Sequence, residues 1–217
     1  MIVELCGLPG SGKSTLAAAV SEKAGNVKDR RELLRPYRYL RHLSKVKKLS
    51  ETYCLLSKNE KELLGFAREY ESCDGRYACL LLHLYRAIKL HKKGAAYLLE
   101  EGPLQYLTSI AYDSALVETE ALKRAVSIMT QHEKAVIVCE CPVDVIIDRI
   151  AGREKRGDRY NIDDKDKLTE LLRIKKENID FLIKRFDGSV YYLDMTEPIA
   201  GNADRVLDIL RQEVIIL

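Results

Sequence analysis

The eight residues from Gly7 to Ser14 match the pattern G-x-x-x-x-G-K-[ST] at every position. They follow a short apolar run, Ile2 to Cys6, that is typical of a buried strand, and they open a helical segment that ends near Lys23. Glycines allow such a loop to wrap a phosphate with its N–H groups pointing inward, and the helix N-terminus adds the positive end of its dipole. The pattern, in this strand–loop–helix context, predicts a nucleoside triphosphate site.

Individual residues of the loop have separate predicted tasks. Lys13 reaches the outer phosphates with a mobile point charge, and the hydroxyl of Ser14 is placed to ligate Mg²⁺. We therefore expect ATP and Mg²⁺ as cofactors, with Lys13 serving both binding and catalysis. The nucleotide-binding residues expected in this segment are Gly7, Pro9, Gly10, Ser11, Gly12, Lys13, Ser14 and Thr15.

Length and composition restrict the remaining classes. A chain of 217 residues, 47% hydrophobic and 32% charged, can form one domain with a closed core and is not disordered throughout. The net charge of +3 is too small to indicate nucleic-acid binding over the whole surface. The six cysteines form no C-x-x-C pair, and no apolar stretch is long enough to span a bilayer. These features favour reduced, buried thiols and a cytoplasmic location.

Strands that alternate with helices predict an α/β fold with a parallel sheet covered on both faces, in a single domain over residues 1–217. Residues 30–93 contain no convincing strand and predict a helical insertion that binds the acceptor. The strands expected after the first lie at 95–99, 135–139 and 190–193, and the helices at 30–48, 59–71, 76–92, 104–132 (with an interruption at 113–114), 142–151, 165–186 and 203–214.

Two carboxylates, Glu100 and Glu101, come at the carboxyl end of the strand expected over 95–99. That end of an open α/β sheet faces the ligand crevice, where a carboxylate can hold Mg²⁺-bound water or accept a proton from an attacking hydroxyl. Because adjacent strand residues point to opposite faces, we expect one of the two to serve as a metal and substrate ligand. Glu101 is slightly favoured as the catalytic one, since Gly102-Pro103 bends the chain directly after it. The alternative is a pair of solvated charges.

Arginines are concentrated between Arg149 and Arg159. Arg149 and Arg153 are four residues apart and share a helix face, and Arg156 lies in a Gly-containing loop. Guanidinium groups match phosphate oxygens, and such a loop can close and exclude water. We expect a lid over residues 152–164, with Arg149 and Arg153 binding the nucleotide, Arg153 and Arg156 catalytic, and Arg159 binding the acceptor. A solvated charge run is the alternative, because acidic residues are interspersed.

The segment from Lys28 to Lys48 carries nine Lys or Arg residues and only two acidic ones. Interleaved Arg and Tyr side chains can bind a phosphate and stack on a planar base. Arg35, Tyr37 and Arg38 are therefore candidates for binding a nucleoside or nucleotide acceptor. Two other interpretations stay open: a small RNA-facing patch, and a solvated basic helix whose Tyr rings pack on the core.

These motifs, in this order, resemble the small P-loop kinases of the nucleoside and nucleotide kinase group, with thymidylate kinase-like and adenylate kinase-like proteins nearest. Glu101-Gly102 looks like the acidic-Gly motif at the third strand end of these kinases. The stretch from Leu193 to Pro198 resembles the one that borders the adenine ring, which makes Thr196 and Pro198 candidate nucleotide-binding residues.

The resemblance implies a P-loop three-layer sandwich, with a five-stranded parallel sheet, helices on both faces, an arginine lid and an acceptor-binding helical region. The chain also departs from the group. Gly102 stands where thymidylate and deoxynucleoside kinases carry an Arg after the acid, the second strand expected near Val27 is hardly visible, and the usual acceptor-site signature is missing.

Together, the motifs predict an enzyme, an ATP- and Mg²⁺-dependent phosphotransferase that moves the γ-phosphoryl group to a small acceptor, with a nucleoside or nucleotide favoured. One alternative is a kinase of a non-nucleotide small molecule such as an antibiotic or a sugar. Another is a regulatory P-loop NTPase that binds RNA or protein. We expect ATP and a small acceptor as partners, and neither a nucleic acid nor a membrane; a homodimer and the choice between ATP and GTP stay open.

Overall fold

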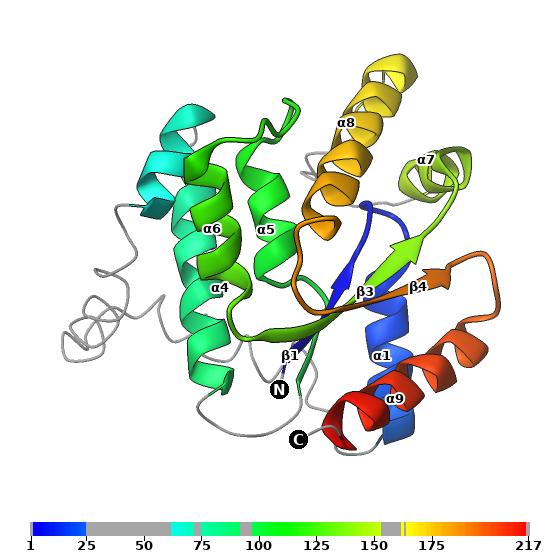
Figure 1. Cartoon of the computed structure of the whole chain (residues 1–217). Coiled ribbons are helices and arrows are strands. Elements are labelled where there is room, and N and C mark those ends of the chain that lie inside the picture. Colours follow the sequence, from blue (N-terminus) through cyan, green and yellow to red (C-terminus); the bar gives the residue numbers. More distant parts are fainter. Residues whose placement is uncertain are drawn as a thin grey trace, which may run out of the picture.

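The computed structural model describes residues 2–24, 62–71, 75–91, 97–152, 162 and 164–215 (Figure 1). Its strands are β1 (Ile2–Cys6), β2 (Tyr97–Leu99), β3 (Glu133–Glu140) and β4 (Ser189–Asp194). Its helices are α1 (Lys13–Ala24), α4 (Gly75–His91), α5 (Pro103–Ile110), α6 (Glu120–Thr130), α7 (Val143–Ala151), α8 (Lys165–Ile183) and α9 (Ile199–Ile215). A further helical stretch covers residues 62–69.

The strands form one sheet in the order β2-β1-β3-β4, and every neighbouring pair is parallel. This confirms the α/β class. The count of five strands was wrong for the described part of the chain, which has four. The strand expected near Val27 falls outside the described residues, and the sequence there is rich in charge and lacks the continuous apolar run typical of a buried parallel strand.

Helices cover both faces of the sheet, as expected for a three-layer fold. Figure 1 shows α1 and α9 together on one side, and α4, α5, α6 and α8 on the other. The side chains of β3 alternate between these layers. Ala135 and Ile137 belong to the core shared with α1 and α9, whereas Val136 and Val138 belong to the core shared with α5, α6 and α8. The continuous apolar run of β3 reflects burial on both faces.

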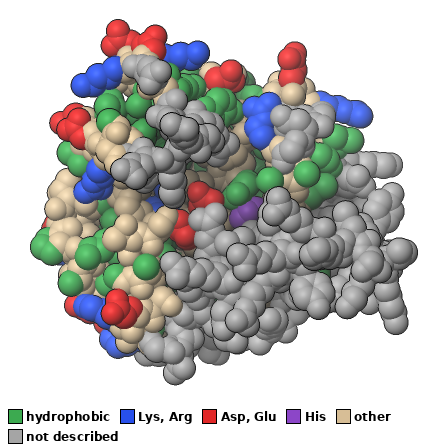
Figure 2. Space-filling model, turned by 180° about the vertical axis from the view of Figure 1, so that it is seen from behind, with side chains coloured by type: hydrophobic (Ala, Val, Ile, Leu, Met, Phe, Trp, Pro, Cys, Tyr) green, Lys and Arg blue, Asp and Glu red, His purple; other side chains and the backbone are tan. Residues whose placement is uncertain are grey.

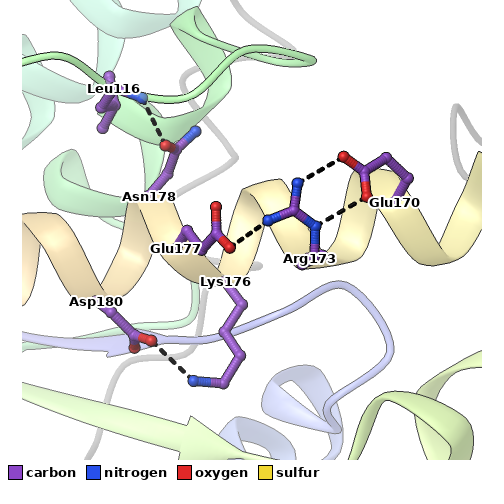
Figure 3. Close-up of polar contacts among 7 residues, drawn as sticks. All are labelled: Leu116, Glu170, Arg173, Lys176, Glu177, Asn178 and Asp180. Atoms are coloured by element: carbon purple, nitrogen blue, oxygen red, sulfur yellow. Dashed lines mark hydrogen bonds and ion pairs between the residues drawn. The ribbon is translucent and has the colours of Figure 1, made fainter.

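The helix expected over 104–132 is divided into α5 and α6, with the break at the interruption expected near Asp113-Ser114. A buried side chain of α8 supports the intervening loop: Asn178 accepts the N–H of Leu116 at 2.7 Å (Figure 3). The same amide donates to the carbonyl oxygens of Ala111 and Ser114. Asn178 thus pairs three backbone groups of a segment that forms neither helix nor strand.

Helix caps account for two of the observed boundaries. Thr119 accepts the N–H of Leu122 and begins α6, while Asp164 accepts the N–H groups of Asp166 and Lys167 and begins α8. The exposed side of α8 carries ion pairs, such as Lys176 with Asp180, at helical spacing (Figure 3).

The described cysteines are free thiols, as expected, but Cys79 and Cys141 are only partly buried, whereas buried thiols were expected. Cys6 and Cys139 are buried, and burial raises the pKa of the Cys139 thiol to about 12. Such thiols pack as small apolar groups. None of the helices within the described ranges is long and apolar enough to cross a membrane.

Candidate active site

The glycine loop connects the end of β1 to the start of α1, as the strand–loop–helix pattern predicted. Gly10 and Gly12 have φ values of +86° and +98°, which L side chains rarely adopt. A Cβ on Gly7 would lie 2.7 Å from the carbonyl oxygen of Cys139, so the loop approaches the end of β3 closely. A Cβ on Gly12 would lie 3.2 Å from Met195 Cε. The loop therefore adjoins the residues after β4, the stretch expected to border the adenine ring.

Lys13 is buried and folds back on its own loop. Its Nζ donates hydrogen bonds to the carbonyl oxygens of Gly7 and Leu8, both at 2.8 Å. Burial lowers the pKa of Lys13, and the thiols and carboxylates around it, Glu101 and Glu100 among them, oppose part of that shift. The ammonium group therefore bonds to loop carbonyl groups and also has acidic side chains near it.

The acidic end of β2 meets the loop directly. The hydroxyl of Ser14 donates a hydrogen bond to Glu100 Oε1, across the parallel pairing of β1 with β2. Glu100 is buried and Glu101 is partly exposed. Of the two carboxylates, Glu100 is thus the one in contact with Ser14, whereas the sequence slightly favoured Glu101.

A hydroxyl and a carboxylate are oxygen ligands of the kind that Mg²⁺ prefers. Within the described ranges, no three His, Cys, Asp or Glu side chains gather as a metal-binding group. Mg²⁺ held by Ser14 and Glu100 would take its other ligands from water and phosphate, as this ion usually does in phosphotransfer sites. Figure 2 shows acidic side chains and a histidine together in a recess of the molecular surface.

Arg149 connects the loop to the residues after β4. From α7, its guanidinium group donates to the carbonyl oxygens of Ser11 at 3.3 Å and Met195 at 3.2 Å. Next to Met195, Thr196 is held by Asp194, whose carboxylate accepts both the N–H and the hydroxyl of Thr196. The carbonyl of Pro198 accepts N–H groups in the first turn of α9. The structure thus brings Arg149 and Met195 next to the glycine loop, with Thr196 and Pro198 following Met195 in the chain.

Among the remaining predicted site residues, only Thr15 lies within the described ranges. Thr15 is exposed on α1, one position beyond Ser14. The remaining arginine and tyrosine candidates lie outside the described residues; they are Arg35, Tyr37, Arg38, Arg153, Arg156 and Arg159.

The sequence analysis missed a buried acid inside β1. Glu4 is fully buried, and its carboxylate accepts the backbone N–H groups of Gly102, Leu104 and Gln105 at 3.0, 3.0 and 2.8 Å. Burial raises the pKa of Glu4, and these hydrogen bonds oppose the shift. Glu4 thereby supplies the N-terminal cap of α5 from a neighbouring strand. An acid within an apolar strand was the signal available in the sequence.

Glu4 also explains why glycine follows the strand-end acids. A Cβ on Gly102 would lie 2.5 Å from Glu4 Oε2, so any larger residue would displace the buried carboxylate. Gln105, one turn into α5, was missed as well: its side-chain amide is hydrogen-bonded to both the N–H and the carbonyl oxygen of Gly7.

A second buried acid, Glu133 at the start of β3, pairs in register with Ile2 and adjoins Glu4. No N–H or hydroxyl donor in the described part of the chain is bonded to its carboxyl group. Burial, together with the charge of Glu4, raises the pKa of Glu133 well above its ordinary value. A protonated Glu133 can donate to Glu4, so that the pair carries one negative charge rather than two.

A family model described as an AAA domain matches residues 2–173. That range is more than half of the chain and contains the glycine loop, the strand-end acids and the arginine-rich segment. The chain belongs to this AAA-domain family. No curated protein sequence matches it.

Solved structures with the same fold include deoxyadenosine kinase from M. mycoides in several complexes. The complex with dCTP is 16% identical with a TM-score of 0.50, and the match covers 98% of this chain and 100% of that one. The complex with dATP is 14% identical with a TM-score of 0.52, covering 97% and 99%. The complex with dCMP and a flexible dCDP is 15% identical with a TM-score of 0.51, covering 98% and 100%. In the residues that the structure describes, this AAA-domain protein therefore has the fold of a small P-loop kinase.

Proposed function

We propose that the protein is an ATP- and Mg²⁺-dependent kinase that transfers the γ-phosphoryl group to a nucleoside or nucleotide. The observation that carries the proposal is the contact of Ser14 with Glu100, which joins the phosphate loop to the acidic strand end at one edge of the sheet. Phosphoryl transfer requires mainly positioning and charge stabilisation, and this edge supplies groups for both.

The described residues have separate roles in this proposal. The loop amides and Lys13 bind the phosphates, with Lys13 exchanging the carbonyl oxygens of Gly7 and Leu8 for phosphate oxygens. Ser14 and Glu100 would hold Mg²⁺, which neutralises charge on the phosphate oxygens when bound. The strand-end acids orient the acceptor hydroxyl and accept its proton, with Glu101 as the second candidate beside Glu100.

The base and the moving phosphoryl group would be bound by residues on the other side of the loop. Arg149 with Thr196 and Pro198 would border the adenine, in line with the hydrogen bonds of Arg149 to the loop and to Met195. The lid arginines Arg153, Arg156 and Arg159 are proposed from the sequence pattern alone.

The acceptor class is proposed from the fold and from the basic, tyrosine-containing segment. Deoxyadenosine kinase structures with this fold contain dATP, dCTP or dCMP. Arg35, Tyr37 and Arg38 have the side chains needed to bind a sugar phosphate and to stack on a base.

The test is ADP release in a coupled assay with the purified chain, ATP and Mg²⁺, across nucleosides, nucleotides, sugars and aminoglycosides. We expect turnover with a nucleoside or nucleotide, its loss on chelation of Mg²⁺, and its loss in Lys13→Ala with the circular dichroism spectrum unchanged. Turnover only with a sugar or an aminoglycoside would contradict the acceptor class. Full turnover in Lys13→Ala would contradict the site itself.

A further inference from the structure

One side chain pairs both backbone groups of the first glycine in the phosphate loop. Gln105 Oε1 accepts the N–H of Gly7 at 3.1 Å, and Gln105 Nε2 donates to the carbonyl oxygen of Gly7 at 3.0 Å. The two residues are 98 positions apart, and Gln105 is buried. The amide therefore ties the loop to α5, the helix that begins directly after the strand-end acids.

The carbonyl oxygen of Gly7 has two donors, Gln105 Nε2 and Lys13 Nζ. In the proposed function, Lys13 leaves this oxygen to reach the phosphates. A buried carbonyl oxygen that loses its only hydrogen-bond donor destabilises the protein, because water cannot reach it to replace that bond. Gln105 removes that penalty, because its Nε2–H stays on the oxygen after Lys13 has left.

The backbone of Gln105 is itself fixed by a hydrogen bond to β1. Its backbone N–H donates to Glu4 Oε1 at 2.8 Å, and the same carboxylate fixes the N–H groups of Gly102 and Leu104. The first turn of α5 is therefore anchored on the strand that leads into the loop. The amide of Gln105 reaches Gly7 from a fixed backbone, which restricts the geometry in which it can bond.

We propose that Gln105 is a positioning residue of the nucleotide site. It holds Gly7, and with it the start of the phosphate loop, in one geometry while Lys13 exchanges loop carbonyl oxygens for phosphate oxygens. The inference rests on the proposed binding of ATP and goes beyond it, since it assigns part of the affinity to a residue that does not touch the nucleotide.

A merely structural role predicts something different. A buried amide that only satisfies two backbone groups would change the stability of the protein and leave the affinity for nucleotide unchanged. Asn178 offers a matched control, because its buried side-chain amide also pairs backbone N–H and C=O groups, in the loop between α5 and α6 (Figure 3).

The experiment compares Gln105→Glu and Gln105→Met with Asn178→Asp and Asn178→Leu. Calorimetric titration with Mg²⁺ and a non-hydrolysable ATP analogue gives the affinity, and thermal melting without nucleotide gives the stability. We expect both Gln105 variants to bind the analogue about tenfold more weakly or worse, with the larger loss in Gln105→Glu, whose carboxylate retains Lys13 and provides no donor. In turnover, KM for ATP rises in both variants more than kcat falls. The Asn178 variants melt earlier and keep the wild-type affinity.

A wild-type protein that binds the analogue, together with Gln105 variants that bind it equally well, would overturn the inference and leave the proposed function intact. A wild-type protein that binds no analogue would overturn the proposed function instead. If the Gln105 variants do not fold, hydrogen exchange at the Gln105 side chain of the wild type decides the question. We expect the Nε2 proton that is bonded to the carbonyl oxygen of Gly7 to stay protected with the analogue bound, and its rapid exchange in that complex would refute the role.

Discussion

The carboxylate of Glu4 occupies the space that a side chain on Gly102 would need, with Oε2 2.5 Å from the position of a Cβ. The φ of Gly102 is −114°, which any residue can adopt, so the requirement for glycine comes from this contact and not from the backbone. Through it, an acid of β1 determines which residue follows the acidic end of β2.

Replacing Gly102 by Ala should therefore destabilise the fold. The new methyl group must displace a fully buried carboxylate from three N–H donors, and we expect a loss of about 2 kcal/mol or more in the free energy of unfolding, measured in urea. Gly201→Ala is the control, because a Cβ there would meet nothing within 4 Å and the position is helical. That variant should be as stable as the wild type or gain up to about 1 kcal/mol. Equal stability of both variants would contradict the steric role of Glu4.

The pair of buried acids predicts how stability depends on pH. Burial and the charge of Glu4 raise the pKa of Glu133 in the folded protein. The contribution of Glu133 to stability is therefore complete below its pKa in the unfolded chain, near 4.5, and is lost as the pH rises toward its pKa in the folded protein. In Glu133→Gln the amide is neutral at every pH and donates to Glu4. We expect the free energy of unfolding of Glu133→Gln, relative to that of the wild type, to increase by about 1.4 kcal/mol per pH unit above 4.5, up to the pKa of Glu133 in the folded protein.

Urea unfolding of both proteins between about pH 5 and pH 7 measures this difference for the Glu133–Glu4 pair, and titratable groups remote from the pair cancel. Glu118→Gln, which removes an exposed ion pair with Arg185, is the control. Its free energy of unfolding relative to the wild type should not increase with pH over this range. A difference between Glu133→Gln and the wild type that is constant across the range would rule out a shifted acid at Glu133.

Local patterns in the sequence predicted most of the described elements and the phosphate loop. The apolar run 135–139 and the stripe along 165–186 predicted β3 and α8, because burial on a strand or helix leaves a period in the sequence. The pattern from Gly7 to Ser14 predicted the strand–loop–helix context that the structure shows. The strand predicted over 135–139 begins two residues earlier in the structure, because the polar residue Glu133 does not fit the apolar pattern of a buried strand.

The long-range polar contacts of the site were not predictable in the same way. Gln105 and Asn178 look like ordinary polar positions of helices, and their partners lie 98 and 62 residues away in the chain. Periodicity reports that a position is buried but does not identify its partner. The choice between Glu100 and Glu101 depended on side-chain direction after a three-residue strand, where the bend at Gly102 makes alternation a poor guide.

His132, whose ring stacks on that of His91, should titrate below the usual range. The rings of His91 and His132 lie 4.4 Å apart, and burial, with a smaller contribution from His91, lowers the pKa of His132. A proton NMR titration should give His132 a pKa below 6.5 in the wild type. In His91→Gln that pKa should rise only partway, since burial is the larger cause. A full return to 6.5 would show that His91, not burial, dominates.

The contact between Ser14 and Glu100 predicts which strand-end acid matters most. Glu100→Gln removes the carboxylate next to the loop hydroxyl, so we expect kcat to fall about 10²- to 10⁴-fold and the Mg²⁺ concentration for half-maximal rate to rise. Glu101→Gln is the matched control, differing by one position and also close enough to Lys13 to affect its pKa. It should retain more activity and need no additional Mg²⁺. Steady-state rates measured across a Mg²⁺ series separate the two variants, and a larger loss in Glu101→Gln would transfer the role to that residue.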